Sequence, residues 1–341
     1  MTTIKILGID LGKSCFHLIG HDHSGKEVLR KKYSRVKLIH YLSQLPQTVI
    51  AFEACGGAHW LGRQCLSLGH EVKLIPPQYV RAYVKGNKND FIDAAAIAEA
   101  ANRPSMRFVA VKSEQAQVIS AIHRIRSGFI KERTACMSRI GSILLEFGVS
   151  LPQGHATMKR LFSWLAEQSQ SLPSLLIHEL QVVHDHYLLL NERITEHDKQ
   201  LKALVDQDEN GRLLKSIPGV GDLVASQCLA DLGAVDQFKN GRNMAAWLGL
   251  VPRQHSTGGK STLLGISKRG NKHLRTLFIH GARALLAKPN KVGQVFAPWI
   301  NKLRETKPFN VATVALANKL ARIAWSVLKY HQPFNAEKLH A

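Results

Sequence analysis

Acidic residues directly follow two apolar stretches near the start of the chain, and this arrangement restricts the fold more than any other feature. Residues 4–9 form a largely apolar run that ends on Asp10, and residues 48–52 form a second run that ends on Glu53. Each run has the length and composition of a buried β-strand. We therefore expect two buried strands, each followed at once by a carboxylate.

Two further acids, Asp90 and Asp93, lie within residues 86–100, where the composition changes to Ala, Ile and Glu after Asn89. These residue types favour a helix, and Asp90 suits its N-cap or first turn. Residues three apart lie on the same side of a helix, one turn above the other. Two carboxylates held together repel each other unless a cation lies between them. The alternative is an ordinary acidic first turn, which the helix dipole favours.

The strands and helices expected around these acids follow the order β-β-β-α-β-α-β-α. Turn residues at 23–25 separate the second and third strands, and Pro76 and Pro77 follow the fifth. This order, with acids after the first and fourth strands and in the last helix, resembles the ribonuclease-H-like fold, in its RuvC-resolvase branch. The remaining strands are expected at residues 15–19, 26–31 and 71–75, and the helices after Ser34, at 58–68 and after Asn89.

In that fold the first and fourth strands are neighbours at the sheet centre, and the last helix packs beside them. The resemblance thus implies that the carboxylates of Asp10, Glu53, Asp90 and Asp93 converge on one site. Clustered carboxylate oxygens are ligands for Mg²⁺ or Mn²⁺. Two such ions could flank a scissile phosphate, one activating the nucleophile and one stabilising the leaving oxygen.

The chain of 341 residues carries a formal net charge of +21 and has a sequence pI near 10.0. Residues 1–110 have 15 basic and 8 acidic side chains, residues 111–209 have 11 and 12, and residues 210–341 have 20 and 5. This excess favours a polyanionic partner, most simply nucleic acid. The alternative is a generally basic protein without such a partner. We expect an α/β domain and two helical domains with these boundaries.

The middle region, residues 111–209, is expected to be helical because its apolar residues keep helical spacing. The clearest series alternates steps of four and three residues, which is the signature of a coiled coil. The region is close to neutral, which favours a spacer or an oligomerisation arm over a binding surface. An intramolecular helical hairpin fits the same pattern. The series is Leu176, Leu180, Val183, Tyr187, Leu190, Ile194, His197, Leu201 and Leu204, and only His197 breaks its apolar character.

Two glycine-containing segments mark the last third of the chain. Residues 213–225 predict a helix, a Pro-Gly-Val-Gly turn and a second helix, so that Gly219 and Gly221 could present backbone N–H groups to a phosphate. A plain turn between two helices is the alternative. Residues 250–260 are expected to form a polar, Gly-rich loop between apolar helices, whose hydroxyls and lysine could reach a phosphate. A surface loop without function would have the same composition.

Cysteine usage and the N-terminus indicate the compartment. The five cysteines are scattered, odd in number and without a CxxC pair, which argues against a zinc site or a disulfide framework and agrees with a reducing environment. The N-terminus lacks a signal-peptide pattern, and no segment is expected to cross a membrane. We therefore expect a cytoplasmic protein without a membrane partner.

Taken together, the motifs resemble the DEDD transposases of bacterial insertion sequences, in the group called family one-hundred-and-ten. In chain order they are GIDLGK, FEACGG, KNDFIDAAAIA, IPGVG, GLVPRQHSTGGK and GISKRGNKHLR, and PRQHSTGGK is nearest to the one-one-one-one subgroup. The resemblance covers nearly the whole chain. It implies a RuvC-like catalytic domain, a coiled-coil insertion and a C-terminal transposase domain with a serine nucleophile. It also implies a structured non-coding guide RNA, the bridge RNA, which pairs with donor and target DNA.

The resemblance assigns catalysis and metal binding to the four acids, and it places the nucleophile in Ser256-Thr257-Gly258. Related sequences have Glu-Ser-Gly, so an ungapped match selects Thr257 and a one-residue gap selects Ser256. We favour Ser256, because a serine hydroxyl is the less hindered nucleophile. Contacts to nucleic acid are expected from Lys13, Lys88, Gly219, Gly221, Arg253, Lys260, Lys268, Arg269, Lys272 and Arg275.

The resemblance therefore implies an RNA-guided DNA transposase that cuts and rejoins donor and target DNA, and we expect it to act as a homo-oligomer, either a dimer or a tetramer, in the bacterial cytoplasm and at the nucleoid. Because a long helical insertion separates the acids from Ser256, we expect a composite site completed across protomers. One alternative is a RuvC-like, metal-dependent DNA junction endonuclease in which the serine has no role, and the STGGK segment argues against it. Another is a non-catalytic nucleic-acid-binding protein, against which the intact acids argue.

Overall fold

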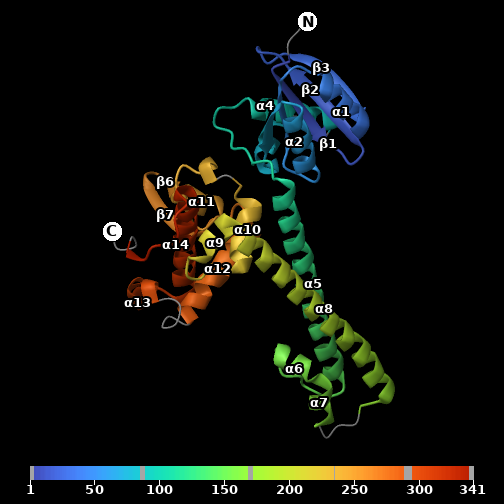
Figure 1. The fold of residues 1–341 in the computed structure, drawn as a ribbon, viewed down its shortest axis with the longest axis vertical. Helices are drawn as coiled ribbons and strands as arrows, with labels where there is room; N and C mark the ends of the chain where they lie inside the picture. The colour runs from blue at the N-terminus through green and yellow to red at the C-terminus, as the bar shows by residue number, and fades with distance from the viewer. Residues whose placement is uncertain (1–3, 85–88, 168–171, 234, 288–293, 338–341) are drawn as a thin grey trace. The chain divides into compact units, whose positions relative to one another are not determined.

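The computed structural model of the chain describes residues 4–84, 89–167, 172–233, 235–287 and 294–337. Contacts divide the chain into two compact units, residues 1–115 and 116–341. The first unit is a mixed sheet with helices, and the second is mostly helical (Figure 1). This is the fold class expected from the sequence.

A five-stranded sheet with the order β3-β2-β1-β4-β5 forms the centre of the first unit. The pairs β1–β2 and β2–β3 are antiparallel, whereas β4 runs parallel to both β1 and β5. Strand β1 is therefore central with β4 beside it, as the ribonuclease-H-like order implies. The elements are β1 (Ile6–Leu11), β2 (Cys15–His21), β3 (Glu27–Ser34), α1 (Arg35–Gln44), β4 (Val49–Glu53), α2 (Ala58–Ser67), β5 (Glu71–Ile75), α3 (Pro77–Val80), η1 (Arg81–Tyr83) and α4 (Asp90–Ala101).

Helices cover both faces of this sheet. Leu7 belongs to the core shared with α1 and α2, and Ile6 belongs to the core shared with α4, so the two cores lie on opposite faces. Gly8 lies under α4, because a Cβ there would come 2.2 Å from the carbonyl oxygen of Ala94. The glycine in β1 and the small residues of α4 thus let the helix lie directly on the sheet.

Two long antiparallel helices, α5 and α8, begin the second unit (Figure 1). They are joined side by side: Nε of Arg126 donates to Oδ1 of Asp198 at 2.6 Å, and Nη1 of Arg133 donates to Oδ1 of Asn191 at 2.9 Å. A separate domain at 111–209 stays a prediction. The helices are α5 (Glu114–Glu146), α6 (His155–Lys159), α7 (Leu161–Ala166) and α8 (Ser174–Gln207).

The heptad series of α8 packs against its own chain. Leu180, Tyr187 and Leu190 are buried in one core with Ile140 of α5. The intramolecular helical hairpin, one of the two arrangements that fit this spacing, is therefore present, and pairing of protomers through this region stays a prediction. Leu176, Val183, His197 and Leu204 of the series are only partly buried.

The rest of the second unit packs around α14 (Phe309–Tyr330), whose Leu316 and Leu320 are buried in its core. By length and composition α14 could span a membrane, contrary to the expectation from the sequence. Half of its apolar window is buried, as in the core helix of a folded unit, and we interpret it as such. The other helices are α9 (Glu209–Lys215), α10 (Asp222–Asp231), η2 (Val235–Gln237), α11 (Gly241–Trp247), α12 (Lys272–Ala287), η3 (Gln294–Phe296) and α13 (Ala297–Thr306).

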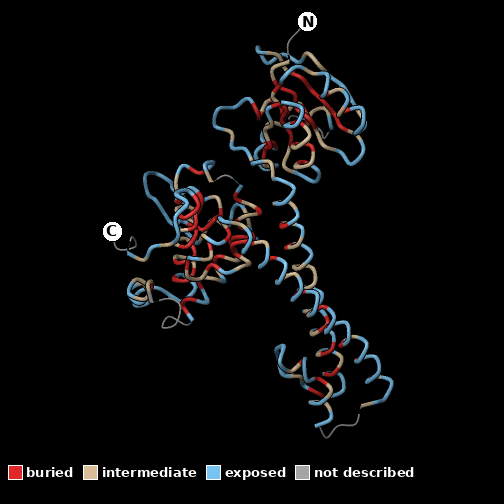
Figure 2. Tube along the Cα trace, viewed as in Figure 1, coloured by how far each residue is buried: buried red, intermediate tan, exposed pale blue. Residues whose placement is uncertain are grey.

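A β-hairpin replaces the loop expected at residues 250–260. Strand β6 (Pro252–Thr257) pairs antiparallel with β7 (Lys260–Ile266). Gly258 and Gly259 form its two-residue turn, with φ of 56° and 76°, a region that favours glycine. The hairpin is exposed along nearly its whole length (Figure 2).

Candidate metal centre and nucleic-acid interface

Strand pairing brings Asp10 and Glu53 to the same edge of the sheet. Ile9 of β1 lies beside Phe52 of β4 in parallel register, and each acid is the next residue along its strand. Side chains alternate between the two faces of a strand. Asp10 and Glu53 therefore both belong to the face that α4 covers.

Helix α4 begins at this site and supplies the other two acids. Asn89 is its N-cap residue, because the Asn89 side chain accepts a hydrogen bond from the Phe91 N–H at 2.9 Å. Asp90 is thus the first helical residue and not the N-cap. The N–H of Asp93 donates to the Asn89 carbonyl oxygen at 3.0 Å. Both aspartates lie in the first turn, where the helix dipole favours negative charge.

A histidine joins these acids. His17 of β2 lies opposite Asp10 in the strand register, and its Nδ1 is 3.4 Å from Oδ2 of Asp90. The residue is 7% exposed, and its ring meets Phe91 edge to face. One ligand atom from each of Asp10, His17 and Asp90 lies within 4.8 Å of the others. His17 was not identified as a site residue from the sequence, because only the register of β1 with β2 places it beside Asp10.

The surroundings of Glu53 connect it to the same group. Burial raises the pKa of its carboxyl, and the charges of Asp10 and Asp93 raise it further. Burial also raises the pKa of the nearby Cys55 thiol, with Glu53 and Asp10 adding to the effect. Asp10 is thus close to Asp90 through the group with His17, and it acts together with Asp93 on the carboxyl of Glu53. Carboxylates grouped in this way are short of positive charge, which a divalent cation would supply.

The donor set fits a hard divalent cation. Carboxylate oxygens are the ligands that Mg²⁺ and Mn²⁺ prefer. Asp10 and Asp90 offer them within one group with His17, and Glu53 lies close enough to Asp10 and Asp93 for their charges to raise its pKa. An imidazole beside a ligating carboxylate commonly fixes the orientation of that carboxylate. The contact between His17 and Asp90 has this character.

Ser256 and Thr257 lie in β6, next to the hairpin turn. Ser256 pairs with Ser261 and Thr257 pairs with Lys260. The side-chain amide of Gln254 donates to Oγ of Ser256 at 2.7 Å and reaches Oγ of Ser261 at 3.2 Å. An amide donor cannot act as a general base, so activation of the Ser256 hydroxyl requires another group.

The predicted helix–turn–helix is present at α9 and α10, and its two glycines differ in their surroundings. Gly219 has φ of 84°, and a Cβ there would come 2.7 Å from Cδ1 of Leu285 in α12. A Cβ at Gly281 of α12 would come 2.1 Å from the carbonyl oxygen of Gly219. Gly219 therefore has a packing role. Gly221 is the exposed N-cap of α10 with open space around it, so only Gly221 has room for a phosphate.

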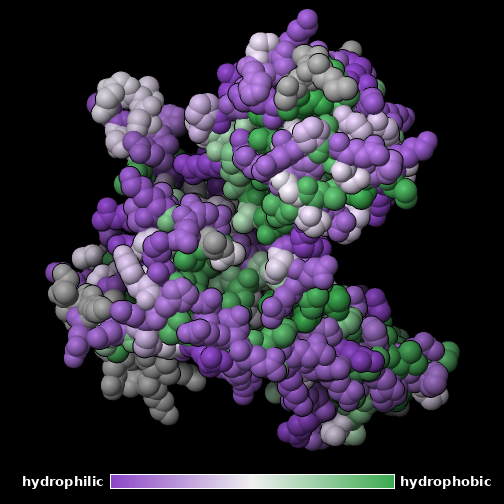
Figure 3. Space-filling view, turned by 45° about the horizontal axis from the view of Figure 1, so that its top comes forward, coloured by the Kyte–Doolittle hydropathy of each residue, from purple (hydrophilic) through white to green (hydrophobic). Residues whose placement is uncertain are grey.

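Most of the predicted phosphate contacts are exposed, and much of the surface drawn in Figure 3 is hydrophilic. Arg275 differs, because it is buried and its Nη1 donates to the Leu248 carbonyl oxygen at 2.9 Å. Burial also lowers the pKa of its guanidinium. Arg275 thus fixes the chain before α12 in place, and we leave it out of the proposed interface. Lys88 lies outside the described residues. The exposed residues are Lys13, Arg253, Lys260, Lys268, Arg269 and Lys272.

Comparison with known proteins identifies the family. Residues 7–149 match the DEDD transposase domain of the IS110 group, and residues 211–296 match the family described as Transposase IS116/IS110/IS902. The chain is 45% identical over 327 residues to the transposase for insertion sequence element IS1328 of Yersinia enterocolitica, which covers 96% of this chain and 97% of that protein. It is 41% identical over 339 residues to the transposase for IS1111A of Coxiella burnetii, with coverage of 98% and 92%.

A ribonuclease-H-like unit with grouped acids, together with a helical transposase unit, defines the chain as a DEDD-type transposase. It belongs to the IS110 family. The chain is therefore an enzyme that acts on DNA, and its DEDD nuclease domain implies a divalent metal.

Proposed function

We propose that the chain cuts and rejoins DNA at the ends of an insertion sequence, with Asp10, Glu53, Asp90 and Asp93 as ligands for Mg²⁺ or Mn²⁺. The observation that carries this proposal is the grouping of these acids at one edge of the sheet, where ligand atoms of Asp10, His17 and Asp90 lie within 4.8 Å of one another. The bound cations would stabilise the charge that develops on the phosphate and lower the pKa of an attacking hydroxyl. His17 would hold the Asp90 carboxylate in position.

The proposed nucleophile is Ser256. Its Oγ would form a bond to the scissile phosphorus while the bond from phosphorus to the deoxyribose oxygen breaks, and that oxygen would leave with a proton. The phosphoserine link stores the bond energy, so a second DNA hydroxyl can reverse the step and rejoin the strands. Two properties of Ser256 support this role: it is exposed on the hairpin, and its hydroxyl is less hindered than that of a threonine.

The proposed partners are donor DNA, target DNA and a guide (bridge) RNA, bound by a homo-oligomer. The last 132 residues, 210–341, carry 20 basic and 5 acidic side chains, which suits contacts to sugar–phosphate backbones. The PRQHSTGGK segment supports the assignment to the one-one-one-one subgroup. Joining two duplexes requires at least two active centres, which favours a dimer or tetramer.

The proposal is tested by recombination of a plasmid-borne element in a bacterial host. Asp10→Asn is expected to abolish recombination while the protein still folds and binds nucleic acid, because it removes one anionic ligand at nearly constant volume. Full activity of Asp10→Asn would refute the metal site.

Sequencing of nucleic acid that co-purifies with the protein tests the guide RNA: a single structured RNA from the element supports it, and random cellular RNA contradicts it.

A further inference from the structure

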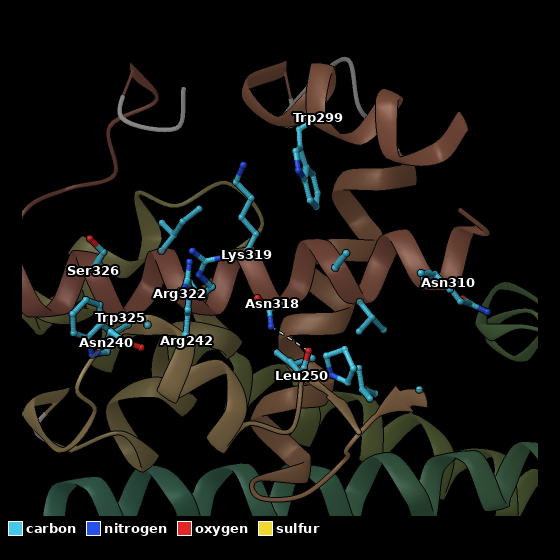
Figure 4. A pocket seen from close by; sticks show the side chains of 18 of the residues that line it. Asn240, Arg242, Leu250, Trp299, Asn310, Asn318, Lys319, Arg322, Trp325 and Ser326 are labelled. Atoms are coloured by element: carbon cyan, nitrogen blue, oxygen red, sulfur yellow. Dashed lines mark hydrogen bonds between the residues drawn. The ribbon is translucent and has the colours of Figure 1, made fainter. Parts of the chain in front are cut away.

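A large pocket opens in the second unit, and neither the four acids nor the hydroxyl residues of the hairpin are among the described residues that line it. Its volume is about 1230 Å³, and its walls come from α11, α13, α14 and the base of the β6–β7 hairpin (Figure 4). Ligand pockets typically measure about 300–1,000 Å³. This pocket is therefore large enough for more than one drug-sized group.

Aromatic and aliphatic side chains form much of its wall. Trp299 projects from α13 toward α14 (Figure 4). Trp325 of α14 is held by a hydrogen bond from its Nε1 to the carbonyl oxygen of Phe238 at 3.3 Å. Both tryptophans are half-buried, so each keeps some accessible ring surface. Such surfaces suit a flat, apolar group such as a nucleobase.

The polar groups of the pocket are cationic or amide in character. Arg242, Lys319 and Arg322 are among its lining residues, and no carboxylate is among the described side chains that line it. Nζ of Lys319 lies 4.9 Å from the ring centroid of Trp299. Burial lowers the pKa of Lys319, and the positive charge of Arg322 lowers it further, as expected where cations gather without a neighbouring carboxylate among the described lining residues.

Amide side chains complete the lining. Asn240, Asn310 and Asn318 each reach the pocket. Nδ2 of Asn318 donates to the carbonyl oxygen of Leu250 at 3.1 Å, which fixes the side chain on the floor of the pocket (Figure 4). Amides carry both donors and acceptors and can pair with the polar edges of bases.

We propose that this pocket binds unpaired nucleotides of the DNA strand that the enzyme cuts. Bases would stack on Trp299 and the apolar wall, and phosphates would lie against Arg242 and Arg322. Strand cleavage and rejoining require some bases at the break to leave their partners, and the pocket is a place to hold them. Pro252 and Ile266 at the hairpin base line the pocket, so a strand leaving it reaches the hairpin that carries Ser256. The inference rests on the DNA-handling activity of the family and does not require Ser256 to be the nucleophile.

The first test measures binding of a fluorescein-labelled 12-nucleotide oligodeoxythymidylate to the full chain in EDTA, on the Ser256→Ala background. Metal and chemistry are absent, so a failure of the proposed cleavage cannot affect the result. Trp299→Ala and Arg322→Gln are each expected to weaken binding about tenfold, the first because it removes a stacking surface and the second because it removes a phosphate contact. Lys302→Gln is the control, because Lys302 is exposed on α13 and does not line the pocket. It should change affinity less than twofold, and unchanged affinity in both pocket variants would overturn the proposal.

The second test identifies the contact. A 5-iododeoxyuridine oligonucleotide is photocrosslinked to the full chain and the modified peptides are mapped by mass spectrometry. Crosslinks to Trp299 or Trp325 support the proposal, and crosslinks confined to other segments overturn it. Two further outcomes also overturn the proposal. If an oligouridylate binds the pocket in preference to DNA, the pocket is a site for RNA. If Trp299→Ala lowers the molar mass of the particle measured by light scattering and leaves the DNA affinity unchanged, the pocket is a contact between copies of the chain.

Discussion

Ser256 and Thr257 are consecutive residues of β6 whose side chains belong to opposite faces of the hairpin. Across the strands Ser256 pairs with Ser261 and Thr257 pairs with Lys260, and side chains alternate between the faces of a strand. A phosphate that approaches one face of the hairpin therefore meets only one of these hydroxyls. The two candidates for the nucleophile can be separated by mutation.

Ser256→Ala is expected to abolish formation of the covalent protein–DNA adduct, lowering its rate by at least about a thousandfold, because the proposed nucleophile is removed and Thr257 belongs to the other face of the hairpin. Thr257→Val should retain the adduct within about tenfold. Ser261→Ala is the matched control, since Ser261 shares the face and the Gln254 contact of Ser256. The adduct is measured on denaturing gels and its site is mapped by peptide sequencing. An adduct on Thr257 in the Ser256→Ala protein would assign the chemistry to threonine.

The Glu53 carboxyl is expected to make the stability of the folded protein depend on pH and on bound metal. Its folded-state pKa lies above the ordinary value of 4.5, because of burial and of the charges of Asp10 and Asp93. The folded state thus binds its proton more tightly, and the metal-free protein loses stability as pH rises above about 4.5 through the folded pKa. Glu53→Gln should therefore raise the thermal midpoint at neutral pH in EDTA.

Added Mg²⁺ or Mn²⁺ should reverse the difference in thermal midpoint between the wild type and Glu53→Gln. The wild-type protein is expected to gain several degrees in differential scanning fluorimetry, whereas Glu53→Gln gains little, because a ligand that binds only the folded state stabilises it. Glu71→Gln, an exposed change at the start of β5, should behave like the wild type in both conditions. An equal metal response in Glu53→Gln and wild type would remove Glu53 from the metal site.

Local patterns were sufficient to predict the order of strands and helices in the first unit and to place Asp10 and Glu53 at the ends of two of its strands. Asp10 and Glu53 each directly follow an apolar run, and strand pairing then brings them to the same edge of the sheet. His17 could not be predicted in the same way, because its place beside Asp90 depends on the register of β1 with β2 and on the position of α4. Tertiary pairing of this kind leaves no periodic signal in the sequence.

The hairpin at residues 252–266 and the partner of the α8 heptad also could not be predicted from the sequence, for physical reasons. The hairpin at β6 and β7 is polar and exposed on both faces, so it lacks the apolar alternation that marks a strand, although the Gly258-Gly259 pair is a recognised hairpin turn. The heptad of α8 has the same spacing whether its partner helix is in the same chain or another. The packing of Tyr187 and Leu190 in the core around Ile140 shows that the hairpin forms within the chain, which the spacing alone could not show.

A buried histidine in the second unit predicts acid sensitivity. His123 is 4% exposed, its Nε2 lies 2.9 Å from Oγ of Ser226, and burial lowers its pKa to about 4, helped by His273 and Arg126 and opposed by Asp231. The unfolded chain binds a proton near pH 6.5, so stability falls as pH decreases from about 6.5 to 4, by about 2 kcal/mol at pH 5.

Urea unfolding followed by tryptophan fluorescence at pH 7 and pH 5 measures this effect. His123→Gln keeps a polar partner for Ser226 and cannot take up a proton, so its midpoint should change less between the two pH values than that of the wild type. His178→Gln, an exposed histidine on α8, is the control and should retain the wild-type dependence. Parallel pH dependence in His123→Gln and wild type would show that another group is responsible.

The acids belong to the first unit and Ser256 to the second. A complementation test can therefore decide if the acids and the serine of one active centre come from the same chain or from two different chains. Asp10→Asn destroys the metal site of its own chain, and Ser256→Ala destroys the hydroxyl of its own chain. If the centres are composite, a mixed oligomer contains some centres that take intact acids from one chain and an intact serine from the other. Random mixing into dimers should then restore up to about a quarter of wild-type adduct formation, since half of the dimers are mixed and each of these has one intact centre. Differently tagged chains and a pull-down establish that mixed oligomers form. A mixture that stays inactive while mixed oligomers are present would place the acids and the serine of each centre within one chain.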